Sequence, residues 1–152
     1  MKKGIGVSAL ALASALHVGP ATAASCTMLS VPTLDFGFYT AVSGDVTAEG
    51  NLLFSCVPDL LQTSVTYRVA LGAGAGGSYA PRRLMSGGMG LRYNVYRDVS
   101  RSQVWGDGLN GTWAVVGACT ASCAVPVYGK LFGGQNVRAA QYRDDVVITL
   151  EF

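Results

Sequence analysis

The sequence ends in Tyr142-Arg143-Asp144-Asp145-Val146-Val147-Ile148-Thr149-Leu150-Glu151-Phe152, a stretch in which apolar and polar side chains alternate. A period of two is typical of a β-strand that buries one face. The face expected to be buried carries Val146, Ile148, Leu150 and Phe152. The pattern alone fits an ordinary core strand and a strand at an open sheet edge equally well. At an open edge this stretch would pair readily with another chain, because nothing in it blunts pairing.

The same alternation runs through most of the chain. Residues 33–38 predict a first strand with Leu34, Phe36 and Phe38 on one side. Further strands are predicted at residues 51–57, 63–71, 91–96 and 124–132, with short ones near 104–105 and 113–116. No stretch shows the 3.6-residue period of a helix, and no linker divides the chain. The economical arrangement is one all-β domain, with seven or eight short antiparallel strands in two packed sheets.

Glycine and proline mark the connections between these strands. Residues 72–77, Gly-Ala-Gly-Ala-Gly-Gly, predict a flexible hairpin connection, because the Lys-Ser/Thr and helix of a phosphate-binding loop do not follow. Asn110-Gly111 predicts a tight hairpin turn, although Asn110-Gly111-Thr112 also matches a glycosylation acceptor. Pro126 removes one main-chain hydrogen bond, so we expect it at a sheet edge or a bulge.

The first residues have the pattern of a secretory signal peptide. Lys2 and Lys3 precede an apolar run at residues 5–16, and Ala21-Thr22-Ala23 supplies a small-x-small cleavage pattern. The run is shorter than the ~20 residues that cross a bilayer, so membrane insertion is not expected. Cleavage is expected near Ala23, with a cut after Ala15 as the alternative. The predicted organisation is a signal peptide at 1–23 and a β-sandwich domain at 24–152, exported through the inner membrane to the periplasm.

The net charge excludes two classes of partner. The chain has 11 Lys and Arg against 9 Asp and Glu, and loss of Lys2 and Lys3 with the signal removes the excess. A nearly neutral surface lacks the clustered basic face of nucleic-acid-binding proteins. It also lacks an attraction to anionic lipid. Neither nucleic acid nor a membrane surface is therefore an expected partner.

Four cysteines, Cys26, Cys56, Cys119 and Cys123, follow the predicted cleavage site. An even number in an exported protein predicts disulfides. Of the three possible pairings we favour Cys26–Cys56 and Cys119–Cys123, since the second pair lies in a short loop and can close on itself. Cys56, on the buried face of its strand, is expected to reach across the core to Cys26. Their spacing and an oxidising compartment disfavour a four-cysteine zinc site.

No catalytic residue, metal site or cofactor is expected. The only histidine, His17, lies in the predicted signal, which removes histidine-based nucleophilic, acid–base and metal chemistry from the mature protein. Asp144 and Asp145 are the only close pair of carboxylates. Neighbours on a strand point to opposite faces, so these two cannot flank one glycosidic bond. They are expected to be solvent-facing charges.

Five short motifs follow one another along the mature chain. They are Leu34-Asp35-Phe36-Gly37, Tyr93-Asn94-Val95-Tyr96-Arg97-Asp98, Trp105-Gly106-Asp107-Gly108, Val127-Tyr128-Gly129-Lys130 and the ending Tyr142-x-Asp144-x-Val146-x-Ile148-Thr149-x-x-Phe152. Together, and in this order, they resemble the spore coat protein U domain family, which includes the subunits of archaic chaperone–usher pili. No single motif is diagnostic, but five together are specific.

The resemblance implies an immunoglobulin-like sandwich that lacks its final strand and so leaves an apolar groove. Residues 146–152 would form one wall of the groove, and residues 33–38 the opposite wall. A periplasmic chaperone would fill the groove first, and the N-terminal extension of another pilus subunit would replace it at an outer-membrane usher. The implied destination is the cell surface or a fimbrium, with roles in adhesion and biofilm formation.

One departure from the family concerns the donor strand. A fibre-forming subunit needs an extended, alternating segment ahead of its first cysteine, but Cys26 follows the expected cleavage site almost directly. The earlier cut would leave residues 16–25, a Gly-, Pro- and Ala-rich piece without alternating large side chains. We therefore expect a strand acceptor, as a terminal or stand-alone subunit.

The alternative function is that of a self-contained secreted β-sandwich that binds a glycan or coats a surface. Exposed rings of Trp105, Trp113, Tyr79 or Tyr96 would then supply stacking platforms. Aromatic residues at strand positions are more often buried in the core or packed on a strand face.

Overall fold

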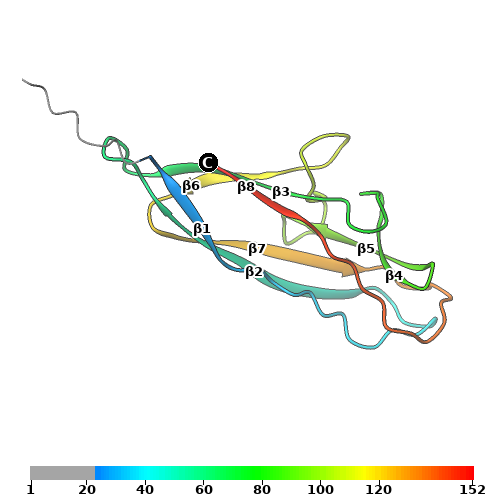
Figure 1. Cartoon of the computed structure of the whole chain (residues 1–152). Coiled ribbons are helices and arrows are strands. Elements are labelled where there is room, and N and C mark those ends of the chain that lie inside the picture. Colours follow the sequence, from blue (N-terminus) through cyan, green and yellow to red (C-terminus); the bar gives the residue numbers. More distant parts are fainter. Residues whose placement is uncertain (1–22) are drawn as a thin grey trace, which may run out of the picture.

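Eight β-strands make up the computed structural model of the chain, which describes residues 23–152 (Figure 1). Five of them form one antiparallel sheet in the order β1 (Ser25–Ser30), β2 (Val46–Val57), β7 (Ser122–Leu131), β5 (Met89–Tyr96) and β4 (Arg82–Ser86). The other three form a second sheet in the order β6 (Val115–Cys119), β3 (Val65–Leu71) and β8 (Ile148–Glu151). This arrangement confirms the all-β, immunoglobulin-like sandwich predicted from the sequence.

The structure bears on the predicted β-sandwich domain and not on the predicted signal peptide. Residues 1–22, on which the signal prediction falls, lie outside the described part of the chain. Between residues 23 and 152 there is no helix with the length and apolar character needed to cross a membrane.

The two sheets pack face to face around one apolar core. Inward positions of the strands supply most of it: Leu52, Phe54, Cys56, Val65, Val69, Leu71, Leu91, Tyr93, Val95, Val125, Val127 and Leu131. On β2, β3 and β5 these are the positions that alternation assigns to the buried face. Trp105 adds a completely buried indole, whose N–H donates to the main-chain oxygen of Val69 at 3.0 Å.

β7 is a central strand, although Pro126 predicts an edge or a bulge. The ladder between β7 and β2 is long and places Pro126 opposite Asn51. The ladder between β7 and β5 covers only residues 128–131. At Pro126 the strand therefore has a partner on one side only, which suits a residue that has no N–H to donate.

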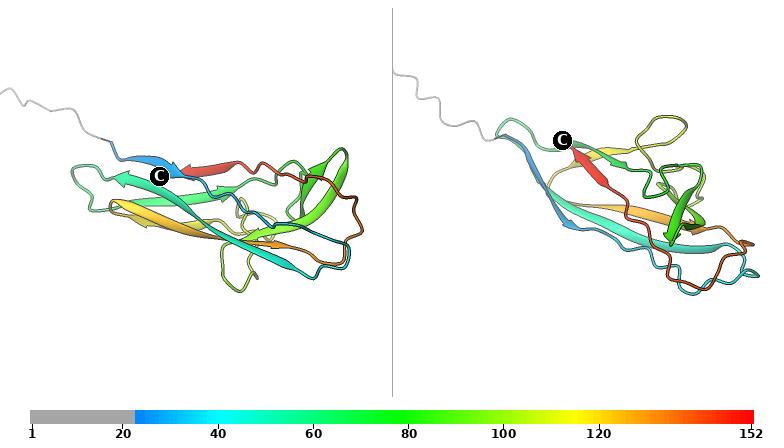
Figure 2. Two further views of the ribbon diagram at one scale, coloured as in Figure 1. Left: turned by 90° about the horizontal axis from the view of Figure 1, so that it is seen from below. Right: turned by 45° about the vertical axis from the view of Figure 1, so that its right-hand side comes forward.

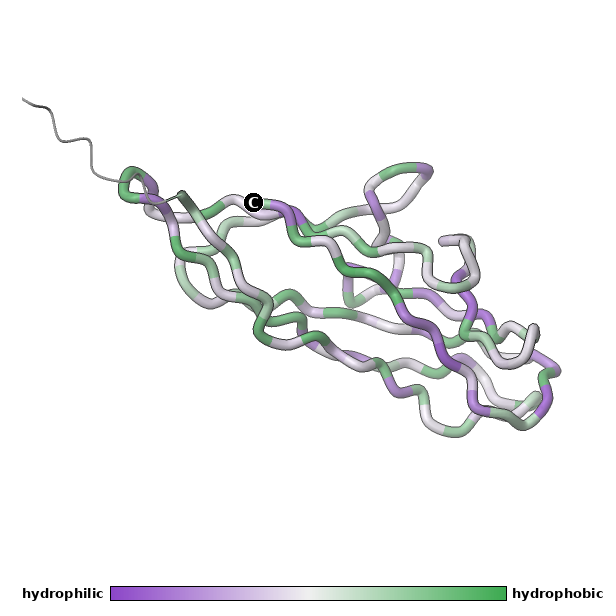
Figure 3. The backbone as a smooth tube through the Cα atoms, viewed as in Figure 1, coloured by the Kyte–Doolittle hydropathy of each residue, from purple (hydrophilic) through white to green (hydrophobic). Residues whose placement is uncertain are grey.

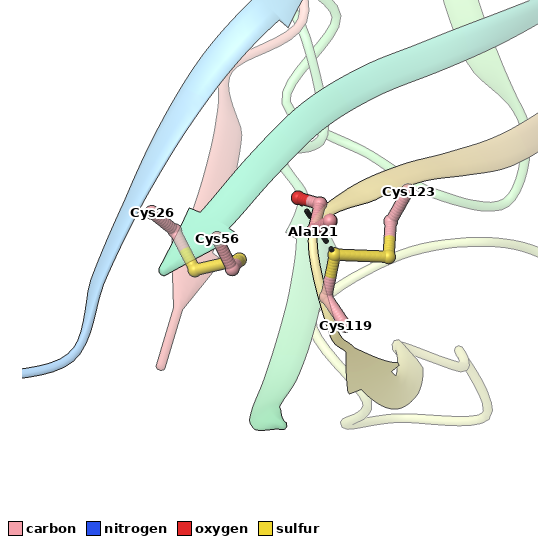
Figure 4. The surroundings of a disulfide bond; sticks show 5 residues. All are labelled: Cys26, Cys56, Cys119, Ala121 and Cys123. Carbon is pink, nitrogen blue, oxygen red and sulfur yellow. Dashed lines mark hydrogen bonds between the residues drawn. A yellow bond between two sulfur atoms is a disulfide. The ribbon is translucent and has the colours of Figure 1, made fainter. Parts of the chain in front are cut away.

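Two disulfide bonds lie close together at one end of the sandwich (Figure 4). Cys26 and Cys56 are directly opposite each other on β1 and β2. Cys119 ends β6 and is joined to Cys123 near the start of β7, so this bond links the two sheets. The pairing is the favoured one, but the Cys26–Cys56 bond does not cross the core as expected. Because β1 and β2 are neighbours in one sheet, facing cysteines are already within bonding reach.

The Gly-rich residues 72–77 form a crossover and not the predicted hairpin connection. They lead from β3 in the three-stranded sheet to β4 in the five-stranded sheet. Gly74 has a φ of +73°, and a side chain placed on it would collide with the carboxylate of Asp144. Glycine is therefore the residue that this close approach requires.

Asn110 and Gly111 form the predicted tight turn but not a hairpin. Both have positive φ values, 51° and 79°, and the N–H of Thr112 donates to the oxygen of Leu109 at 2.9 Å. These features are those of a type I′ turn. The flanking residues 105 and 113 meet in one isolated parallel bridge. The turn therefore closes a loop, and the next strand, β6, begins only at residue 115.

Loss of either disulfide should destabilise the domain, and the two losses should differ. On the chain-entropy model, removing Cys26–Cys56, with a separation of 30 residues, costs roughly 3–4 kcal/mol. Removing Cys119–Cys123, with a separation of 4 residues, costs roughly 2 kcal/mol. Urea unfolding of the two double Cys→Ala variants measures both values. A larger loss for the Cys119–Cys123 pair would contradict this prediction.

Candidate functional site

Two stretches of chain with open hydrogen-bonding edges border the same side of the sandwich. β8 is an edge strand whose only partner within residues 23–152 is β3. Residues 31–36 continue from β1 but make no main-chain hydrogen bond to another described residue. Figure 1 shows the first stretch in red and the second in blue to cyan, and Figure 2 gives two further views. Both stretches can pair with a further strand.

A groove lies between these two stretches. It contains a cavity of about 420 Å³, bordered by residues 31–36 on one side and 144–148 on the other. Its floor is mainly apolar and comes from both sheets: Leu52, Leu71, Leu84, Tyr93, Val95, Trp105 and Val127. Leu52 and Trp105 of this floor have no solvent-exposed surface. The groove thus reaches the core, at a place where one more strand would complete the sandwich.

The first wall is extended chain and not the strand predicted at residues 33–38. Leu34 and Phe36 are half-buried and line the cavity. Pro32, Leu34 and Phe36 lie against Gly50 of β2 and Gly129 of β7, where any Cβ atom would approach them closely. Beyond β1 the chain is therefore seated on the inner side of the five-stranded sheet, in space that two glycines leave free.

Phe38 does not line this cavity. Its side chain is completely exposed, whereas Tyr39 is half-buried and its hydroxyl oxygen accepts a hydrogen bond from the N–H of Gln135 at 2.6 Å. Gly37 explains the difference, because its φ is +66° and its N–H donates to the carboxylate of Asp35. This local turn interrupts the alternation. The predicted inward position of Phe38 is therefore wrong.

The second wall keeps its predicted alternation, but only its last part is a strand. Val146, Ile148 and Leu150 are half-buried and pack against the core, while Val147 is 71 % exposed. Figure 3 shows the change from hydrophilic to hydrophobic residues as the chain enters this wall. The ladder begins at residue 148 because β3, its partner, turns there into the Gly-rich loop. Phe152 lies beyond β8 and is 58 % exposed, so the prediction that it is buried is wrong.

Asp144 ties the second wall to the rest of the domain. The hydroxyl of Tyr93 donates to its Oδ2 at 2.6 Å, and the N–H of Ala75 donates to its Oδ1 at 2.6 Å. Asp144 is half-buried, whereas Asp145 is exposed. The prediction that both carboxylates face solvent is therefore wrong for Asp144.

A buried arginine lies near Tyr93. Arg82 of β4 is 0 % exposed, and none of the ion pairs within residues 23–152 includes it. Its guanidinium donates instead to the main-chain oxygens of Gly72 and Trp105 and to the side-chain oxygen of Asn94, at 2.7–3.0 Å. These bonds satisfy a buried cation through neutral acceptors. They also join β4 and β5 of one sheet to the end of β3 in the other.

Burial is the main influence on the pKa values of Arg82 and Tyr93. It lowers the pKa of Arg82, while Tyr93, Tyr79 and Asp144 act in the opposite direction. Burial, followed by the hydrogen bond to Asp144, raises the pKa of Tyr93 well above its ordinary value. Tyr93 therefore stays protonated at physiological pH and remains a donor to Asp144.

A second cavity, of about 640 Å³, adjoins the groove. It is lined largely by residues 34–39 and 137–142, and it shares Leu34, Phe36 and Leu84 with the first cavity. The two cavities together form one furrow between the segment that follows β1 and the segment that precedes β8.

Burial leaves few of the four predicted aromatic side chains available as stacking platforms for a glycan. Trp105 and Tyr96 are 0 % and 7 % exposed. Tyr79 packs against a guanidinium whose carbon is 4.8 Å from the ring centre. Trp113 is 49 % exposed, but the guanidinium of Arg97 covers it at 4.7 Å. These four residues therefore present no broad stacking surface.

Sequence patterns missed the polar residues of the site. Tyr93 and Asp144 are 51 residues apart, and period-two alternation says nothing about partners at that distance. Gly50 and Gly129 did carry a signal. Each is a glycine at an inward position of its strand, which indicates that another segment packs there.

Comparison with known proteins identifies the family. Residues 12–149 match the spore coat protein U domain family. The chain belongs to this family. The chain is also similar to Protein U of Myxococcus xanthus, which is 36 % identical over 134 residues, covering 79 % of this chain and 72 % of that protein. The resemblance indicated by the five motifs is thus confirmed.

A solved structure shares the fold of this family member. It is the CsuC–CsuE chaperone–tip adhesion subunit pre-assembly complex from archaic chaperone–usher Csu pili of Acinetobacter baumannii. A chain of it matches with a TM-score of 0.56 and 20 % identity, over 85 % of this chain and 40 % of that chain. A chaperone–tip adhesin complex of CFA/I fimbriae biogenesis gives a TM-score of 0.49 and 10 % identity, over 84 % and 41 %. The chain thus spans about two fifths of the solved chains that it matches.

Substitution of Gly50 should disturb the first wall. In Gly50→Ala the new Cβ would lie 2.7 Å from the Cβ of Pro32, and a proline ring cannot rotate away. We expect a loss of about 1–3 kcal/mol in the free energy of unfolding, measured by urea denaturation. The matched control is Gly44→Ala, where the added Cβ meets no atom within 4 Å. Equal stability of the two variants would contradict the close packing of Pro32 on Gly50.

Proposed function

We propose that this member of the spore coat protein U domain family is a structural subunit of a pilus or surface coat that accepts a β-strand from another protein chain. The groove carries the proposal. Its floor is apolar and reaches the core, and both borders have unpaired main-chain groups. An extended segment in the groove would pair with β8 and with residues 31–36, while its alternate side chains fill the cavity.

Two kinds of chain would occupy the groove in turn. A periplasmic pilus chaperone is the first, and the solved Csu complex, which joins a chaperone to a tip subunit, supports this assignment by analogy. A neighbouring subunit is the second, delivered at an outer-membrane usher. The protein would pass through the periplasm and remain at the cell surface or in a fimbrium.

The energetics of the groove favour a permanent occupant. An empty groove leaves apolar wall side chains such as Leu34, Phe36 and Ile148 only half-buried, and full burial of an aliphatic or aromatic side chain contributes roughly 1.5–3 kcal/mol. The open edge of β8 also invites pairing with other exposed strands. The exported chain alone is therefore expected to aggregate or to be degraded.

The proposed role is that of an acceptor, in a terminal or stand-alone subunit. Residues from Ser25 onward are already paired with β2, and Cys26 is covalently fixed to it. This part of the chain is therefore not free to serve as a donor strand for a neighbouring subunit.

Co-expression with the periplasmic pilus chaperone of its own host tests the proposal. The full chain, exported to the periplasm, should be recovered in good yield only as a complex with that chaperone. Ile148→Lys should abolish the recovery, because it places a charge in the apolar wall of the groove without a partner. Affinity purification through a tag on the chaperone measures the complex.

The matched control is Val147→Lys, the same change one residue earlier on the exposed face. This variant should be recovered like the wild type. A wild-type chain that is recovered from the periplasm in undiminished yield as a soluble monomer in the absence of any chaperone would refute the proposed function.

A further inference from the structure

Tyr93 contacts both walls of the groove. It projects from β5 into the floor and is only 3 % exposed. Its ring packs edge-to-face against Phe36 of the first wall, with ring centroids 6.0 Å apart and planes at 64°. Its hydroxyl donates to Asp144 of the second wall at 2.6 Å. One side chain therefore spans the groove from wall to wall.

The main chain around Asp144 is anchored on both sides of this contact. Arg143 exchanges two main-chain hydrogen bonds with Met85 of β4, at 2.6 and 3.1 Å. The oxygen of Val147 accepts a hydrogen bond from the N–H of Gly72 at 2.8 Å. The carboxylate between these anchors is held on its other oxygen by the N–H of Ala75. The second wall thus has a fixed position relative to Tyr93.

An apolar groove without an occupant needs such a support. The hydrophobic effect favours closing the walls over the floor, because closure removes apolar surface from water. Closure would also bury the unpaired N–H and C=O groups that an incoming strand requires. A short, directional hydrogen bond from a hydroxyl to a carboxylate resists both closing and spreading of the walls.

We propose that Tyr93 is the positioning residue of the groove, which holds the two walls at the separation that admits one β-strand before that strand arrives. This inference rests on the proposed function of strand acceptance. Tyr93 acts through Phe36 and Asp144, so its contribution is to the shape of the empty groove.

A positioning role has a kinetic signature. If only the open groove accepts a strand, the apparent association rate constant scales with the fraction of molecules in which the groove is open. Removing the Tyr93 hydroxyl lowers that fraction, while contacts in the finished complex stay the same. The association rate constant should fall, and the dissociation rate constant should not.

The test uses the disulfide-bonded chain, released from its chaperone complex and kept dilute so that aggregation is slow, and a synthetic probe. The probe is a fluorescein-labelled peptide of alternating threonine and valine, with a lysine at each end and long enough to span the groove. Stopped-flow and competition measurements give its association and dissociation rate constants. For Tyr93→Phe we expect association about tenfold slower, the effect of losing one hydrogen bond to a charged acceptor, with dissociation changed by less than about twofold. Asp144→Asn, which weakens the same bond from the other partner, should slow association in the same direction.

The matched control is Tyr67→Phe. Tyr67 lies on β3, packs against Phe54 at a centroid distance of 4.8 Å and does not line the groove. This variant should associate like the wild type. Unchanged association in Tyr93→Phe, or an equal fall in Tyr67→Phe, would overturn the inference while leaving strand acceptance intact. Failure of the wild-type chain to bind the peptide at all would overturn the proposed function and this inference with it.

Discussion

Unpaired main-chain groups along β8 and residues 31–36 are the constraint on which the rest of this sandwich depends. The main-chain groups of a sheet edge next to an apolar cavity need water or another strand as a hydrogen-bond partner, because buried N–H and C=O groups without partners cost free energy. The edge also cannot be fully covered without losing the ability to pair. The domain meets both demands by keeping the walls half-buried. The floor stays continuous with the core, and the polar edges remain within reach of water.

The ends of the sandwich differ in how the two sheets are joined. Near the chain termini the Cys119–Cys123 bond links β6 to β7 covalently. Toward β4 the links are polar: Arg82 binds main-chain oxygens next to both sheets, and Asp144 binds Tyr93 and the Gly-rich loop. Between these fixed ends lies the groove. The width of the groove is therefore determined by the covalent and hydrogen bonds at the two ends. The apolar side chains between them contribute buried area, but their contacts are not directional.

The sequence predicted well which face of a strand is buried, and it predicted poorly which residues far apart in the chain contact each other. Alternation assigned the buried sides of β2, β3 and β5 correctly, because a strand that packs on one face has no other pattern available. It failed at Phe38, where Gly37 reverses the local course of the chain. It also missed β4 and the Tyr93–Asp144 bond, since short strands and contacts between remote residues depend on the tertiary fold. The motifs led to the family, but the exposure of Phe152 had to come from the structure.

The Cys26–Cys56 bond has a mechanical consequence. Tension applied to the chain ahead of β1 meets the disulfide bond to β2 at Cys26, the second residue of β1. The load then reaches β7 through a ladder of ten paired positions, in the middle of the larger sheet. Tension from that direction would therefore be borne by the longest ladder of the domain and not by the six-residue strand β1. Without the disulfide, β1 would separate from β2 one hydrogen bond at a time, which requires little force. The Cys26–Cys56 bond prevents this separation at the start of the strand.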